Sequence, residues 1–165
     1  MIAHRHAAAV LAALVLVSCA ACDLLTQADA EALAQEVSGS LSSTLDDAVG
    51  KDPGQCSYTL GADTPPKTIS LIVRRAASPE QAAGQQEAAE SGLQSLSYSA
   101  RIEKVAGLGD DAFWVGGQLD QLHVRRGDTL LNFTVQVDKQ PLAAARTLAG
   151  KALARLARQP GKPHA

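Results

Sequence analysis

The chain has 165 residues, with 15 basic and 17 acidic side chains and a formal net charge of −2 at pH 7. Its aromatic residues are one tryptophan, two tyrosines and two phenylalanines. A nucleic-acid-binding domain usually presents a basic surface with aromatic side chains on which bases stack. The composition therefore argues against nucleic acid as a partner.

The first 18 residues have the pattern of an export signal. Arg5 precedes an uninterrupted apolar run over residues 7–17, which is too short for a bilayer-spanning helix of about 20 residues. The run ends in Leu-Val-Ser-Cys at positions 16–19, a lipobox pattern, which predicts cleavage before Cys19 and acylation of that cysteine. The alternative is an ordinary signal-peptide cut after a small residue. We expect a lipid-anchored protein of the cell envelope, at the outer membrane or periplasmic face or on the outer face of the cell membrane.

The chain that follows the signal has the size of one domain. We place this domain at residues 19–158 and a disordered tail at 159–165. Residues 19–100 are rich in acidic side chains and residues 101–165 in basic ones. In a single domain this asymmetry indicates two differently charged faces.

The cysteines predict one disulfide bond. If Cys19 carries lipid, Cys22 and Cys56 remain, in an oxidising compartment where disulfides persist. Their bridge would close a loop of about 35 residues and stabilise the domain by at most about 3.8 kcal/mol.

Two helices are predicted in the first two thirds of the chain. From residue 24 to residue 49, apolar residues recur at three- and four-residue spacing, with Thr26 as N-cap and a break near residues 38–40. Asp29 lies outside this apolar stripe. The second helix begins after the N-cap Ser78, has Pro79 at its first position, and ends near Leu96. Because its apolar stripe is thin, we expect it to lie at the sheet edge.

Alternating apolar residues predict the strands. Two strands are expected at residues 56–60 and 68–74, and an antiparallel meander over residues 100–105, 112–115, 118–125 and 129–137. A last helix follows Pro141 and ends near Arg158, with an outer basic strip of Lys151, Arg155 and Arg158. The expected fold class is α+β: an antiparallel sheet with flanking helices at the N-terminus, in the middle and at the C-terminus.

Four stretches resemble a group of small bacterial lipoproteins of unknown function that have a Mog1/PsbP-like α+β domain. They are Cys22-Asp-Leu24-Leu25-Thr26, Cys56-Ser-Tyr58, the segment from Gly107 to Trp114, and the hairpin over residues 122–137. The likeness extends over about residues 22–158, but the segment at 34–49 is longer than in that group. The resemblance implies a fold, a structural cysteine pair and an envelope location, and it implies no activity.

No catalytic or metal-binding set emerges from the acidic residues and histidines. Asp110 and Asp111 are better explained by a turn in which Asp110 binds local backbone amides than by a calcium loop, since no further acid follows at the required spacing. His123 alternates with Leu122 and Val124, so we expect it on the solvent face of the sheet. The predicted domain offers no second histidine and no free cysteine to share a metal with it.

Four residues are candidate contact sites. Arg74, Arg125 and Arg126 belong to arginine pairs that end predicted strands, and they would form either a basic patch or separate solvated strand ends. Trp114 follows Phe113, so alternation predicts that one of the two rings is in the core and the other is more exposed. An exposed Trp114 would be a contact residue, whereas the alternative is a half-buried strand tryptophan.

The sequence predicts a non-catalytic lipoprotein without a cofactor or metal. It would contact the lipid bilayer through Cys19 and bind a membrane-proximal protein partner or a small ligand. The alternatives are a structural or accessory subunit of an envelope complex, and an inhibitor or immunity protein against an exported toxin.

Overall fold

The computed structural model describes residues 21–38, 54–60, 67–96, 101–117 and 119–159. The predicted signal peptide, Cys19, the continuation of the first helix beyond Ser38 and the tail after Gln159 lie outside these residues. Among the described helices, none is both long enough and apolar enough to cross a bilayer.

Six strands form one antiparallel sheet in the order β1-β2-β6-β5-β4-β3. They are β1 (Gln55–Leu60), β2 (Lys67–Arg75), β3 (Arg101–Lys104), β4 (Asp111–Gly116), β5 (Gln121–Arg126) and β6 (Thr129–Val135). The helices are α1 (Ala21–Leu24), α2 (Gln27–Ser38), α3 (Pro79–Leu96) and α4 (Pro141–Arg158). The predicted α+β class, with helices at the N-terminus, in the middle and at the C-terminus, is confirmed.

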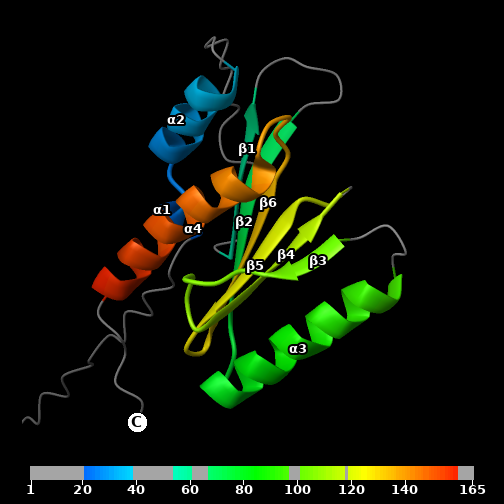
Figure 1. The fold of residues 1–165 in the computed structure, drawn as a ribbon. Helices are drawn as coiled ribbons and strands as arrows, with labels where there is room; N and C mark the ends of the chain where they lie inside the picture. Colours follow the sequence, from blue (N-terminus) through cyan, green and yellow to red (C-terminus); the bar gives the residue numbers. More distant parts are fainter. Residues whose placement is uncertain (1–20, 39–53, 61–66, 97–100, 118, 160–165) are drawn as a thin grey trace, which may run out of the picture.

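Helices cover both faces of the sheet, with α4 on one side and α3 on the other (Figure 1). On the α4 side, period-two alternation buries Leu131, Phe133 and Val135 of β6. The inward face of α4 is built mainly from small residues, which let this helix lie close to the strands: Ala144, Ala145, Leu148, Ala149 and Ala152. The helices α1 and α2 add Leu24, Leu25, Ala30 and Leu33 to this core.

The α3 side is defined by a row of residues in register across four strands. Phe113 of β4 is opposite His123 of β5, His123 is opposite Asn132 of β6, and Asn132 is opposite Ile72 of β2. Residues directly opposite each other in antiparallel strands point to the same face. This row on the second face of the sheet therefore has an apolar side chain at each end and two polar side chains between them.

The helix α3 packs against the central strands β5 and β6. The prediction that it lies at the sheet edge is therefore wrong. Its N-terminus is as predicted, since Ser78 Oγ accepts a hydrogen bond from the Gln81 amide at 3.2 Å. The thin apolar stripe has a different consequence: within the described part of α3, Ala82 and Gln86 are the residues that are fully buried.

Candidate functional site

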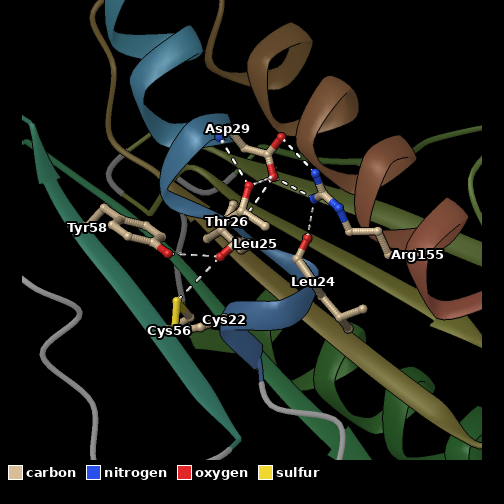
Figure 2. The surroundings of a disulfide bond; sticks show 8 residues. All are labelled: Cys22, Leu24, Leu25, Thr26, Asp29, Cys56, Tyr58 and Arg155. Carbon is tan, nitrogen blue, oxygen red and sulfur yellow. Dashed lines mark hydrogen bonds and ion pairs between the residues drawn. A yellow bond between two sulfur atoms is a disulfide. The ribbon is translucent and has the colours of Figure 1, made fainter. Parts of the chain in front are cut away.

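A disulfide bond ties the start of the domain to the edge strand β1. Cys22 Sγ and Cys56 Sγ are bonded, and the two Cα atoms are 5.0 Å apart, within the range of about 4.4–6.8 Å for disulfides. Figure 2 shows this bridge beside the turn between α1 and α2. Cys56 Sγ also lies 3.5 Å from the Leu25 carbonyl oxygen, a contact without a donated proton because a disulfide sulfur carries none.

The carbonyl groups at the end of α1 are bound by side chains from other elements. A helix of four residues cannot satisfy its own last carbonyls. Arg155 of α4 donates to the Leu24 carbonyl oxygen at 2.7 Å, and the Tyr58 hydroxyl of β1 donates to the Leu25 carbonyl oxygen at 3.1 Å. Burial raises the pKa of Tyr58, so this hydroxyl keeps its proton at neutral pH.

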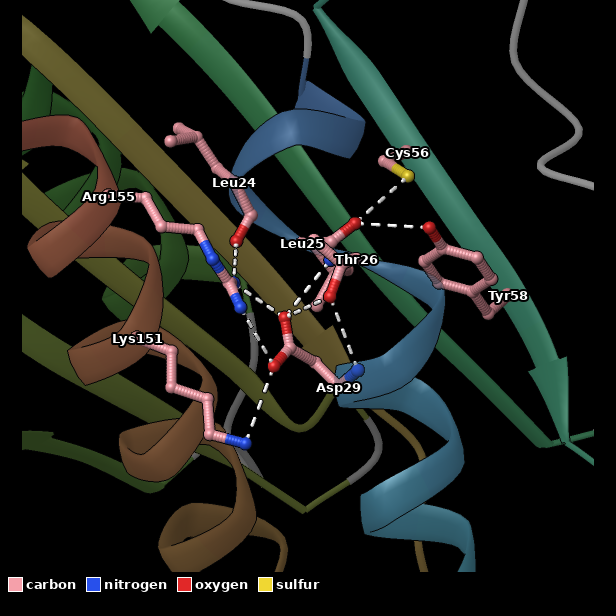
Figure 3. A network of polar contacts seen from close by, with 8 residues as sticks. All are labelled: Leu24, Leu25, Thr26, Asp29, Cys56, Tyr58, Lys151 and Arg155. Atoms are coloured by element: carbon pink, nitrogen blue, oxygen red, sulfur yellow. Dashed lines mark hydrogen bonds and ion pairs between the residues drawn. The ribbon is translucent and has the colours of Figure 1, made fainter. Parts of the chain in front are cut away.

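Asp29 joins α2 to α4 and is the main polar group of this junction (Figure 3). Its carboxylate accepts hydrogen bonds from Arg155 at 2.5 and 3.1 Å and from the Thr26 hydroxyl and amide at 2.8 and 3.1 Å, and Lys151 Nζ lies 3.4 Å away. Thr26 Oγ1 in turn accepts from the Asp29 amide at 3.3 Å, which confirms Thr26 as the N-cap. Burial favours the neutral acid, but the Arg155 and Thr26 bonds outweigh it and hold the pKa of Asp29 well below its usual range.

The junction changes two expectations from the sequence. Asp29, expected outside the apolar stripe, is 5% exposed. The side chains of Lys151 and Arg155 were expected to form a basic outer strip with Arg158. They are instead paired with Asp29, and Arg155 is partly buried. Arg158 remains exposed and donates to the Ala154 carbonyl oxygen in its own helix.

Three of the four strand-end arginines have acidic partners. Arg125 and Arg126 lie 3.5 and 3.2 Å from the Asp110 carboxylate, and Arg75 lies 3.5 Å from Asp128. Asp110 also accepts a hydrogen bond from the Gly127 amide at 2.6 Å. The backbone group that it binds therefore belongs to the β5–β6 turn and not to its own turn. Among the described residues, Arg74 is the member of this group without an acidic partner.

Neither Phe113 nor Trp114 is available for contact. Phe113 is fully buried, and Trp114 is 5% exposed. The two rings point to opposite faces, and both faces are covered, so the expected exposed aromatic residue is absent from this strand. The expectation of Trp114 as a contact residue is therefore wrong.

His123 is also covered, contrary to expectation. Its ring stacks on Phe113 with the centroids 4.5 Å apart and the planes 6° from parallel. Burial lowers the pKa of His123 to about 4, so the imidazole is neutral at pH 7. In the described part of the chain, no group of three or more histidine, cysteine, aspartate or glutamate side chains is placed to hold a metal ion.

A cavity of about 500 Å³ lies between α3 and the sheet. Ile72, His123, Leu130 and Asn132 contribute to its floor, Arg74 lies beside them, and α3 provides the opposite wall with Gln85, Gln86, Ala88 and Ala89. We call this space the α3 cavity. The small side chains of α3 explain it physically, because they leave the space between helix and strands unfilled.

Two residues that line the α3 cavity each have a buried side-chain oxygen without a hydrogen-bond partner among the described residues: Gln86 Oε1 and Asn132 Oδ1. The nitrogen of the Gln86 amide is held by Asp111, donating to its carboxylate at 3.0 Å and to its carbonyl oxygen at 3.2 Å. Because the Gln86 amide nitrogen donates to Asp111, the oxygen is the atom of this amide that has no partner.

Sequence reasoning named Arg74 and missed Gln86 and Asn132. Asn132 was recognisable as a polar residue on the second face of β6, but that face was taken to be exposed. Gln86 carried no signal, since a glutamine in a helix with a thin apolar stripe is normally solvent-facing.

In comparison with known proteins, the chain matches no protein-family model and no curated protein sequence. The resemblance to the Mog1/PsbP-like lipoproteins therefore stays a prediction.

Proposed function

We propose that this protein is a lipid-anchored, non-catalytic binding protein of the cell envelope, and that it holds a small ligand in the α3 cavity. The observation that carries the proposal is the α3 cavity of about 500 Å³ between α3 and the sheet.

The size and lining of the cavity support the same proposal. Small-molecule sites usually have volumes of about 300–1,000 Å³, mostly apolar walls and a few fixed polar groups. The α3 cavity, at about 500 Å³, has the apolar side chains of Ile72, Leu130, Ala88 and Ala89 next to the amides of Gln86 and Asn132.

The N-terminal junction supports a location close to a membrane. Ala21 is the first residue of α1 and is 1% exposed, so it belongs to the domain core and is not part of a free tether. If Cys19 is acylated, two residue steps separate the lipid-bearing residue from the core, a span of at most about 8 Å. The ligand would then be bound by a domain that lies against the lipid headgroups.

A titration with a fluorescent probe tests the proposal. The chain from residue 19 with Cys19→Ser contains every described residue and needs no detergent; its circular dichroism shows whether it is folded. We expect saturable binding of 2-anilinonaphthalene-6-sulfonate at one site per chain. Ala89→Phe, which fills the cavity, should abolish it, whereas Ala154→Phe on the exposed side of α4 should not. Absent binding, or equal binding by the Ala89→Phe variant, would refute the proposed site.

A further inference from the structure

We infer that α3 is a lid: it undocks from the sheet as a unit while the rest of the domain stays folded, and polar side chains of β3 and β4 hold it in place. This inference goes beyond the proposed function and does not depend on it, because the motion belongs to the fold whether or not a ligand enters the α3 cavity. Three features carry it: the few apolar side chains that α3 buries, the glycines within the helix, and the position of its polar contacts.

The first feature is the small apolar interface between α3 and the sheet. Ala82 and Gln86 are the fully buried residues in the described part of α3, and Leu93 is only partly buried. The inward face of α4, in contrast, buries five residues, including Leu148. Apolar burial is the main force that docks a helix on a sheet, and the α3 cavity takes away further contacts. Docking is therefore stabilised much less for α3 than for α4.

Gly84 and Gly92 weaken the helix itself. A Cβ atom added at either position would meet nothing within 4 Å, so packing does not require glycine there. Glycine in a helix interior loses more conformational entropy on folding than alanine does. Most of the stability of a helix in a protein comes from its packing, so an undocked α3 would lose its backbone hydrogen bonds. Its amide protons would then exchange with solvent.

Polar contacts hold α3 along one side. Lys104 Nζ of β3 lies 2.8 Å from the Glu90 carboxylate of α3 and 3.3 Å from the Asp111 carboxylate of β4. Asp111 also accepts a hydrogen bond from Gln86 Nε2 at 3.0 Å. We call these four residues the latch. Among the described residues, no hydrogen bond or ion pair joins α3 to β5 or β6, the strands against which it packs.

The latch is exposed enough to open. The side chains of Lys104 and Asp111 are 58% and 37% exposed, and ion pairs in such positions contribute little to stability. The residue Ala76, ahead of α3, is buried and donates its amide to the Asp128 carbonyl oxygen at 2.8 Å, so the chain before the helix stays attached. Segments with few buried apolar contacts open locally at a lower free energy than the whole domain unfolds. Opening of α3 would expose this face of the sheet and widen the α3 cavity.

Hydrogen exchange measured by nuclear magnetic resonance tests the lid on the chain from residue 19 with Cys19→Ser. We expect the α3 amides to share one protection factor, at least about tenfold lower than that of the β6 amides, and to depend less steeply on low concentrations of urea. Equal protection and equal urea dependence in α3 and β6 would show that α3 opens only when the whole domain unfolds. Amides of α3 that exchange one by one without urea dependence would show fraying. Either result would overturn the inference.

Two stabilising variants separate opening of α3 from global unfolding. Gly84→Ala in α3 and Gly150→Ala in α4 each replace an exposed helix glycine around which a Cβ atom meets nothing within 4 Å. Gly84→Ala should raise the protection of the α3 amides about 2- to 5-fold. Gly150→Ala should raise that of the β6 amides by a similar factor and leave α3 unchanged, because α4 is docked in both states. An equal effect of the two variants on α3 would contradict a separate opening.

A third pair of variants tests the latch. Lys104→Met removes the cation that joins Glu90 to Asp111 and keeps a long side chain, so it should lower the protection of the α3 amides about 2- to 5-fold. The matched control Lys139→Met, at an exposed lysine ahead of α4, should leave α3 unchanged. Unchanged α3 protection in Lys104→Met, or an equal loss in Lys139→Met, would overturn the assignment of the latch. None of these measurements uses a ligand, so the lid and the proposed binding site stand or fall separately.

Discussion

At the scale of single residues, the Asp29–Arg155 pair is the most buried ion pair among the described residues. The Asp29 side chain is 6% exposed and that of Arg155 is 26% exposed, so removal of one partner leaves the other poorly solvated. We expect Arg155→Ala to lower the free energy of unfolding by about 2–4 kcal/mol, whereas breaking the contact of the exposed Lys151 in Lys151→Ala should cost less than about 1 kcal/mol. Urea unfolding at pH 7 measures both, and equal effects would contradict the account.

His123 gives a prediction for the dependence of stability on pH. Its folded-state pKa is about 4, against an ordinary value of 6.5, so between these values the unfolded chain binds a proton that the folded chain does not. Stability should therefore fall as the pH drops from about 6.5 to about 4, by about 2–3 kcal/mol, and this contribution should not grow further below pH 4. His123→Leu, which cannot titrate, should lose less stability over the same interval. If the stability of the parent chain and that of His123→Leu depend on pH in the same way, the His123 ring is not desolvated.

At the scale of elements, much of the fold was predictable because its signals are local. The alternation of residues 129–135, the N-caps Thr26 and Ser78 and the turn at Gly127 each depend on a few adjacent residues. The position of α3 and the burial of Asp29 were not predictable in this way. Alternation shows which residues share a face of a sheet but not what covers that face. Asp29 is paired with an arginine 126 positions away. The exposure of Trp114 and His123 was misjudged because the sequence does not show which helices cover the two faces of the sheet.

The turn before β4 provides a test at this scale. Gly109 has φ +59°, and a Cβ atom there would lie 2.3 Å from the Arg125 carbonyl oxygen; Gly107 has φ +81° and open space around it. Both substitutions by alanine strain the backbone, but only Gly109→Ala also forces β4 and β5 apart. We expect Gly107→Ala to cost about 1 kcal/mol and Gly109→Ala at least about 2 kcal/mol. Thermal unfolding of the two variants measures the difference, and a larger loss for Gly107→Ala would contradict this packing.

At the scale of the whole molecule, the N-terminal junction and the α3 cavity lie on opposite sides of the sheet. The junction of α1, α2 and α4 occupies one face, and α3 occupies the other (Figure 1). The cavity is on the α3 side. This arrangement would hold the first face near the membrane through a short connection and leave the α3 side to receive the ligand.

The anchor itself is tested on the protein produced from its full sequence in a bacterial host. We expect mass spectrometry of the mature N-terminus to find a lipid-modified Cys19. The disulfide leaves Cys22 without a thiol for acylation, so lipid on Cys22 would contradict both the anchor and the bridge. An unmodified N-terminus at Ala21 or later would also refute the anchor. A spacer of about fifteen Gly and Ser residues between Ala20 and Ala21 should keep the fold and increase the distance of the domain from the bilayer, as measured by neutron reflectometry.

The central claim, that a ligand occupies the α3 cavity, is tested most directly by nuclear magnetic resonance of the chain from residue 19 with Cys19→Ser. Titration with 2-anilinonaphthalene-6-sulfonate should shift the side-chain amide signals of Gln86 and Asn132 and the ring signals of His123. The indole N–H of Trp114, on the opposite face, should stay in place. Shifts centred on Trp114 and α4, or no saturable shift at Gln86 and Asn132, would contradict the account.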